Sequence, residues 1–213
     1  VMTGMSIQDN MSAVGFDDAN DSGENVTMEL NAPSYSFADL PTLETEELEP
    51  IDSNTLKIVA AGDLMLHMPQ IKAARETDGS FNFNPPYKYV WEQIQDADIA
   101  IANLETVTAG DDLGFSGFPR FNSPEPVLDA IANTGFDLLV TSNNHSLDQG
   151  KTGIINTIAG ISSRGMEYIG TSKDTRRPYI VMDRNNIKIG ILSYTYDLNG
   201  LDSLLTVNER VNM

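Results

Sequence analysis

Three short apolar runs, each ending in a cluster of polar side chains, constrain the fold of this 213-residue chain more than any other feature. They cover residues 56–61, 97–102 and 136–140 and are rich in Ala, Ile, Leu and Val. Such runs are typical of strands buried on both faces, as in a parallel sheet. The carboxyl ends of parallel strands open into one crevice, where loop residues can converge on a ligand. The sequence therefore predicts an α/β domain in which these ends supply Asp63 and His67, then Asn103 and Glu105, then Asn143, Asn144, His145 and Asp148.

The segments between these runs have the apolar spacing of helices, which favours a layered α/β domain with a mainly parallel sheet. Helices are predicted at 69–76, 87–95, 124–133 and 148–164, a further strand at 167–170, and a hairpin of 179–183 and 187–194. The spacing within 87–95 predicts that Trp91 lies in the core. A loop at 110–124, rich in Gly, Pro and Phe, is expected to cover the strand ends, because long loops in compact domains are commonly functional.

Residues 1–54 lack a sustained apolar period and are expected to form a disordered acidic linker ahead of a domain at 55–213. The formal net charge is −18, and residues 1–56 contain 12 Asp and Glu with no Lys or Arg. Such a surface repels phosphate groups, and no basic patch with interleaved aromatic residues accompanies it, so no nucleic-acid partner is expected. The chain has no Cys, which excludes disulfides, thiolate metal sites and cysteine nucleophiles. No apolar run approaches the roughly 20 residues that span a bilayer.

The polar clusters contain the ligands that hard divalent cations prefer, namely carboxylate oxygen, amide oxygen and imidazole nitrogen. The candidate metal ligands are Asp63, Glu105, Asn144 and His67 or His145. Two cations held in this way would polarise a phosphoryl or acyl oxygen and lower the pKa of a bound water. A nearby imidazole would donate a proton or stabilise developing charge, which makes His145 the candidate catalytic residue.

Each of these residues also has a purely structural interpretation. Asp63 could cap the helix that follows it, and His67 could pack beside its neighbours Met65 and Met68 as a partly buried imidazole. Glu105 is different, because a carboxylate just past a buried strand needs a partner or a cation.

Asn103, Asn143 and Asp148 are expected to support the site. Asn at the end of a strand most often bonds to loop backbone, and that role is favoured for both asparagines. Asp148 could cap the helix that it precedes, or orient His145 from three residues away. Four cations could meet anionic groups of a substrate, although such residues are usually solvated: Arg120, Lys151, Arg176 and Arg177.

Four motifs follow one another in a specific order: Gly62-Asp63-Leu64-Met65-Leu66-His67, Asn103-Leu104-Glu105, Ser142-Asn143-Asn144-His145, and Ser193-Tyr194-Thr195-Tyr196 with Asn199-Gly200. Together they resemble the CapA family of bacterial capsule-synthesis proteins, which includes the PgsA-like component of poly-γ-glutamate synthesis. The resemblance implies a fold similar to calcineurin-like metallophosphatases, a four-layer α/β/β/α sandwich with metals at the strand ends. By that likeness Asp63 and Glu105 stand where metal carboxylates do, Asn144 is a ligand, and His145 assists at the leaving group.

The resemblance also implies what surrounds the domain. The His-bearing segments with which the family completes its site are absent here, so we expect a sandwich that is incomplete at its C-terminus, with two sites for Mn²⁺, Zn²⁺ or Mg²⁺ in the full-length protein. An anchor upstream of Val1 would hold the domain outside the cytoplasmic membrane, with membrane synthase subunits as partners. The expected function is capsule or poly-γ-glutamate biosynthesis, acting on an anionic polymer through a divalent-metal site. The alternatives are a metal-dependent hydrolase of phosphoesters or polymer amides and a non-catalytic partner of a synthase, because fold alone does not settle activity.

Overall fold

A computed structural model describes residues 55–175, 177–205 and 210–213. The predicted acidic linker at 1–54 lies outside the described residues. Within these ranges, no helix combines the length and apolar character needed to cross a membrane.

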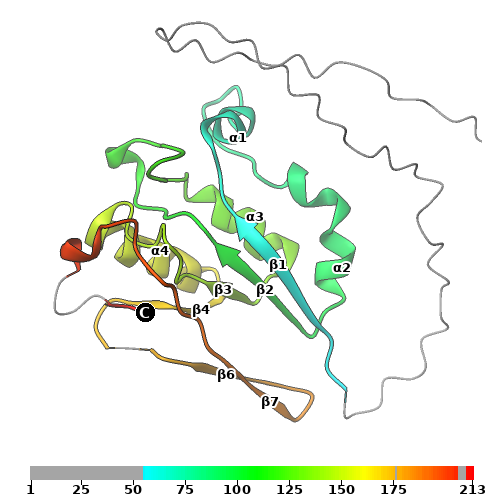
Figure 1. Ribbon diagram of the computed structural model, residues 1–213. Coiled ribbons are helices and arrows are strands. Elements are labelled where there is room, and N and C mark those ends of the chain that lie inside the picture. Colours follow the sequence, from blue (N-terminus) through cyan, green and yellow to red (C-terminus); the bar gives the residue numbers. More distant parts are fainter. Residues whose placement is uncertain (1–54, 176, 206–209) are drawn as a thin grey trace, which may run out of the picture. The chain divides into compact units, whose positions relative to one another are not determined.

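The core of the domain is a four-stranded sheet whose strands are all parallel, as the sequence predicted (Figure 1). Its order is β1 (Ile58–Leu64), β2 (Ile99–Leu104), β3 (Leu138–Val140) and β4 (Glu167–Ile169). Parallel neighbours need crossover connections, and here these contain α1 (Met68–Ala73) and α2 (Trp91–Gln95), then α3 (Pro126–Thr134), then α4 (Gly150–Ser163). Because every strand runs in the same direction, the carboxyl ends of the strands lie at one edge.

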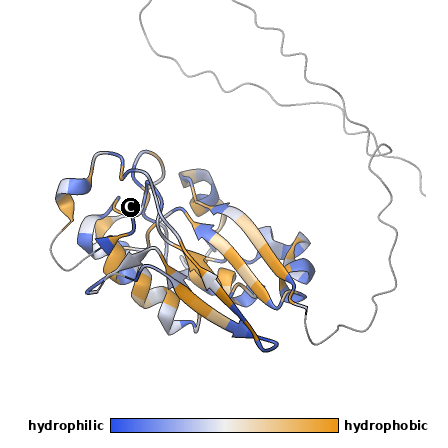
Figure 2. Ribbon diagram, turned by 60° about the horizontal axis from the view of Figure 1, so that its bottom comes forward, coloured by the Kyte–Doolittle hydropathy of each residue, from blue (hydrophilic) through white to orange (hydrophobic). Residues whose placement is uncertain are grey.

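Helices cover one face of this sheet. Side chains of β2 and β3 on that face, such as Leu104 and Leu139, are almost fully buried against Leu128 and Ile131 of α3 and Ile161 of α4. Figure 2 shows how strongly the apolar residues concentrate on the strands. Burial of this kind is the main favourable term that holds the layers together.

A hairpin of β6 (Ile180–Arg184) and β7 (Ile187–Ile191) covers the opposite face. Ile180 and Met182 pack against Ile99, Leu138 and Ile169 of the parallel sheet. The predicted hairpin is confirmed, and its turn residues, numbers 185 and 186, are asparagines with positive φ, a conformation that asparagine tolerates well. The described residues therefore form a helix layer, a parallel sheet and a second sheet, which are three of the four layers expected.

The last described strand pairs with an earlier strand of the domain. β5 (Thr171–Ser172) pairs with β8 (Arg210–Val211), and a third apolar cluster joins Leu147 and Ile158 to Leu198 and Val211. Short 3₁₀ turns complete the fold: η2 (Pro85–Tyr89), η3 (Asp111–Leu113) and η4 (Asp202–Leu204).

The expectation that Trp91 lies in the core is wrong. The predicted helix at 87–95 is split into η2 and α2, and α2 has only five residues, of which Ile94 is the buried one. Trp91 is 48% exposed, and its indole N–H donates to the carbonyl of Asn133 at 3.3 Å. The break in the helix turns the indole along the surface and leaves only its N–H facing the end of α3.

Candidate functional site

The ends of β1 and β2 bring two carboxylates together. A register shift between Ala61 and Asp63 places Asp63 directly opposite Asn103. Such bulges re-aim side chains near functional sites. The Asn103 amide donates to Asp63 Oδ1 at 2.8 Å and to Glu105 Oε2 at 3.3 Å. Asp63 does not cap a helix, because it belongs to β1 and α1 is preceded by His67. Asn103 therefore bridges two acidic groups, and within the described part of the chain its side chain makes no bond to loop backbone.

The pKa of Glu105 is raised above its ordinary value. Burial raises its pKa, and the neighbouring Asp63 raises the pKa further by hydrogen bonding and by charge repulsion. Two carboxylates that share one amide favour a proton or a cation between them. This pair is therefore the part of the site that best suits a divalent cation.

Asn143 joins the end of β3 to the end of β2. Its side-chain N–H groups donate to Asn103 Oδ1 at 3.0 Å and to the carbonyl of Leu104 at 2.9 Å. Its Oδ1 accepts the backbone N–H of His145 at 3.1 Å. The expected backbone-bonding role is confirmed for Asn143, which fixes where the chain turns toward His145.

His145 is held by Asp148. The distance from His145 Nδ1 to Asp148 Oδ2 is 2.8 Å, and the same oxygen accepts the backbone N–H of Phe121 at 2.6 Å. Both side chains are buried, and Asp148 Oδ1 has no hydrogen-bond partner among the described residues. Of the two roles considered for Asp148, the structure supports orientation of His145, since the residue before α4 is Gln149 and Asp148 makes no capping bond.

The hydrogen bond between Asp148 and His145 also bears on which nitrogen of the imidazole carries the proton. Burial raises the pKa of Asp148, while its bonds to Phe121 and His145 lower it. When Asp148 is ionised its oxygens can only accept, so His145 Nδ1 is then the donor of the bond between them. Nε2 lies 3.9 Å from Glu105 Oε1. The arrangement can therefore take or return a proton beside the carboxylate pair.

His67 and Asn144 lie at the margins of this network. The ring of Phe121 stands edge-on between the two imidazoles, with centroids 5.2 Å from His67 and 4.7 Å from His145. The Asn144 amide donates to Asn199 Oδ1 at 3.4 Å. Hydrogen bonds and one ion-pair distance thus join six of the eight predicted site residues: Asp63, Asn103, Glu105, Asn143, His145 and Asp148. Within the described ranges, no such link joins the side chains of His67 and Asn144 to them.

Two residues of the site were not predicted individually. Phe121 belongs to the loop that was expected to cover the strand ends, and its buried ring and backbone N–H hold His145 and Asp148 in place. Asn199 belongs to a motif that the sequence singled out without a role, and its side chain donates to the Asn144 carbonyl at 2.9 Å. The richness of the loop in Phe was the available sign for the first, and the Asn-Gly turn was the sign for the second.

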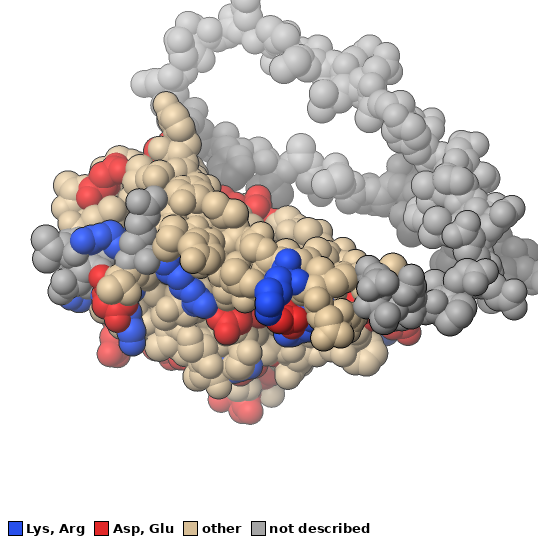
Figure 3. Space-filling view, turned by 90° about the horizontal axis from the view of Figure 1, so that it is seen from below, with Lys and Arg blue, Asp and Glu red and all other residues tan. Residues whose placement is uncertain are grey.

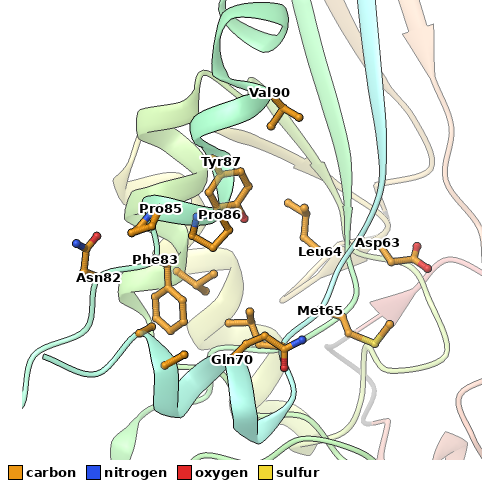
Figure 4. Close-up of a pocket in the computed structure, with 14 residues that line it drawn as sticks. Asp63, Leu64, Met65, Gln70, Asn82, Phe83, Pro85, Pro86, Tyr87 and Val90 are labelled. Carbon is orange, nitrogen blue, oxygen red and sulfur yellow. The ribbon is translucent and has the colours of Figure 1, made fainter. Parts of the chain in front are cut away.

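An apolar cavity lies beside this site, and Asp63 is among the residues that line it. It has a volume of about 500 Å³ between the end of β1, α1 and η2, with Leu64, Phe83 and Tyr87 among its walls. Figure 4 shows the Asp63 carboxylate pointing away from this cavity. The acidic pair therefore belongs to the polar edge of the sheet.

The donor set fits a hard cation in kind. Asp63 and Glu105 offer carboxylate oxygens. Burial is the largest cause of the raised pKa of Glu105, and repulsion by Asp63, which a cation would relieve, raises it further. Among the residues that the structure describes, no three His, Asp or Glu side chains gather closely enough to hold a metal ion. The carboxylate pair is thus suited to one side of a metal site.

A parallel α/β sheet, backed by a second sheet, that gathers carboxylates, amides and a carboxylate-oriented imidazole at its strand ends is a metallophosphatase-like architecture. Comparison with known families places the chain within that class: it belongs to the family described as bacterial capsule synthesis protein PGA_cap, whose model matches residues 57–210. It is 23% identical over 162 residues to the capsule biosynthesis protein CapA of Bacillus anthracis. That match covers 71% of this chain and 38% of the length of the relative. The predicted family and fold are confirmed.

Proposed function

We propose that this capsule-biosynthesis domain acts on an anionic polymer such as poly-γ-glutamate, outside the cytoplasmic membrane, through a divalent-metal site at the strand ends. The observation that carries the proposal is the hydrogen-bonded network that joins Asp63, Asn103 and Glu105 to His145 and its partner Asp148. A family member that served only as a scaffold would not need a half-buried Glu105, paired with the exposed Asp63, next to an oriented imidazole.

In this proposal Asp63 and Glu105 hold the cation, with His67 and Asn144 at its margins. A bound divalent cation would polarise an oxygen of the substrate and lower the pKa of a water molecule. The chain's own residues do the rest. Asn103 orients both carboxylates, Asn143 positions the turn that bears His145, and His145 Nε2 moves a proton at the edge of the site.

Metal binding is tested by titrating Mn²⁺ and Zn²⁺ into the chain and into Asp63→Asn and Glu105→Gln variants. Each variant should weaken metal binding more than about tenfold, since even partners one step removed from a metal affect affinity by that factor. Asp129→Asn is the matched control, because it removes one carboxylate charge that pairs with Arg164. Equal affinity in the wild type and in both site variants would refute the proposed metal site.

A second candidate function is hydrolysis of phosphoesters or of polymer amide bonds. The His145–Asp148 pair favours it, because a general acid or base must be oriented and carry its proton on a defined nitrogen. Turnover of a phosphoester and of poly-γ-glutamate by metal-loaded protein, lost in His145→Gln, would establish it. Capsule production in cells that is abolished by deletion of the gene but retained with His145→Gln would instead select a non-catalytic role beside a membrane synthase.

The proposed location and partners need separate tests. Protease added to intact cells from which the wall has been removed should digest the domain if it lies outside the membrane. Co-purification with membrane synthase subunits would identify the partners. The family membership and the acidic composition of residues 1–56 support both expectations.

A further inference from the structure

A second cavity has His145 in its wall, and neither Asp63 nor Glu105 lines it. Its volume is about 330 Å³. Three separate segments build it, namely the loop before α3, the turn after β3 and the segment that follows β7. Its lining residues are Phe118, Pro119, Arg120, Asn144, His145, Asp148, Asn199 and Leu201.

Arg120 is the cationic side chain of this cavity. Most other cations in the described ranges have an acidic partner or an aromatic ring nearby, and Figure 3 shows Lys and Arg lying beside Asp and Glu on one face of the molecule. The ion pairs are Lys57–Asp96, Arg164–Glu125, Arg164–Asp129, Arg177–Glu167, Arg184–Asp137 and Lys188–Asp183. The Arg120 guanidinium is exposed and forms no ion pair within the described part of the chain.

Two amides face each other in the same wall. Asn199 Nδ2 donates to the Asn144 carbonyl at 2.9 Å, and Asn144 Nδ2 donates to Asn199 Oδ1 at 3.4 Å. Each amide nitrogen has two hydrogens, so each keeps one N–H for another acceptor. Asn199 has a φ of 52°, and its backbone N–H is bound by Asp197 Oδ1 at 2.9 Å, which fixes the turn.

Asp148 is the acidic residue among those that line this cavity, and it interacts electrostatically with Arg120, but it offers little of its surface to a ligand. Asp148 is 2% exposed, and its Oδ2 already accepts from His145 and from the Phe121 backbone. A ligand in the cavity therefore meets a guanidinium, two amide donors and an imidazole edge. These groups are complementary to an oxyanion.

We propose that this cavity binds an oxyanion group of the substrate, a carboxylate or a phosphate, with Arg120 as its charge partner and Asn144 and Asn199 as its neutral donors. The proposal rests on the proposed function and deepens it, because it names the part of the site that recognises the anionic substrate. An oxyanion held here lies beside the imidazole of His145, whose Nε2 is 3.9 Å from Glu105 Oε1.

The test is a titration of the 213-residue chain followed by amide and guanidinium NMR resonances, in EDTA, so that no metal contributes. Inorganic phosphate and glutarate are the two probes. Saturable shifts at residues 118–121 and 199 are expected, with binding at least about tenfold weaker in Arg120→Gln, since bonds to charged groups are among the stronger ones. Arg75→Gln is the matched control, because Arg75 stacks on Phe81 and lines neither cavity.

A second variant guards against a loss caused by misfolding. Asn199→Asp keeps a residue type that tolerates positive φ and places a negative charge in the cavity, so it should also weaken both probes several-fold. Tighter binding of phosphate would identify a phosphoester substrate, and tighter binding of glutarate a polycarboxylate. No saturable shift in the wild type, or equal binding in the wild type and both site variants, would overturn the proposal.

The oxyanion and metal titrations together distinguish failure of the oxyanion proposal from failure of the proposed metal site. Loss of metal binding in Asp63→Asn with oxyanion binding intact would support both assignments. Oxyanion binding by this chain without binding of Mn²⁺ or Zn²⁺ would leave the anion site standing and show that the carboxylate pair alone does not hold a metal ion.

Discussion

Replacing Asp148 with Asn should lower the free energy of unfolding by about 2 kcal/mol and disturb the protonation of His145. Asp148 Oδ2 accepts two hydrogen bonds, at 2.8 Å from His145 and at 2.6 Å from the Phe121 backbone. A bond to a charged group contributes about 1.5–3 kcal/mol and a neutral one about 0.5–1.5 kcal/mol, so each bond loses roughly 1 kcal/mol.

Two further effects act in opposite directions. The amide removes the cost of burying a charge, which is real here because burial raises the pKa of Asp148. It also places an N–H₂ group where Oδ1 now lies buried without a partner, and an unsatisfied buried donor costs about 1–3 kcal/mol. These terms largely offset each other, which leaves the loss at about 2 kcal/mol.

Urea unfolding measures the stability, and ¹⁵N NMR of the imidazole reports which nitrogen of His145 carries the proton. In the wild type the proton should sit on Nδ1, and in Asp148→Asn the two forms should mix, because an amide can donate as well as accept. Asp129→Asn serves as the control, since its carboxylate is 53% exposed and such surface pairs contribute about 1 kcal/mol or less. Unchanged stability together with an unchanged imidazole spectrum would refute the argued role of Asp148.

Three other substitutions test the fold and the acidic pair. Glu105→Gln should raise the free energy of unfolding of the metal-free chain at pH 7. The raised pKa of Glu105 means that its contribution to stability is favourable at low pH and is lost as pH rises through the folded pKa. The stability gained by the substitution should therefore fade toward pH 4 in urea unfolding. Gly170→Ala should destabilise by at least about 2 kcal/mol, since Gly170 has a φ of 119° and a Cβ would lie 2.3 Å from the Ser142 backbone nitrogen. Leu139→Ala should cost about 2–5 kcal/mol in thermal or urea unfolding, because Leu139 is fully buried in β3.

Apolar runs made most of the fold predictable. The strands at 99–104 and 138–140 are buried by layers on both faces, so their sequences read as apolar throughout and the parallel sheet could be inferred. The strand at 58–64 was expected to be buried in the same way, but it is the edge strand and alternates between exposed and half-buried positions. Trp91 was misplaced for a physical reason. A helical period assigns one buried stripe, but a five-residue helix is too short to keep a bulky indole on it. The exposed position of Trp91 depends on the break between η2 and α2, and the local sequence does not predict that break.

In the candidate site too, some residues could be predicted from the sequence and others could not. Asp63, Glu105 and His145 could be proposed because polar residues at strand ends converge in any parallel sheet. The bridging role of Asn103 could not, because it depends on the register shift between Ala61 and Asp63. The contribution of Phe121 is a backbone N–H, and every residue except proline carries one, so no residue type marks it.

The two parts of the site differ in how firmly the fold holds them. The acidic pair and the Asn103–Asn143 bond connect neighbouring strands of the parallel sheet, so their geometry changes only if the sheet changes. The cavity around Arg120 is built from loops that meet at His145, and loops accept substitution and insertion more readily than strands. It follows that relatives with the same strand ends can differ in the anion that they recognise while the proton-transferring imidazole stays in place. Exchange of the loop containing Arg120 between relatives should therefore alter the preference between phosphate and carboxylate probes and leave the affinity for divalent metal unchanged.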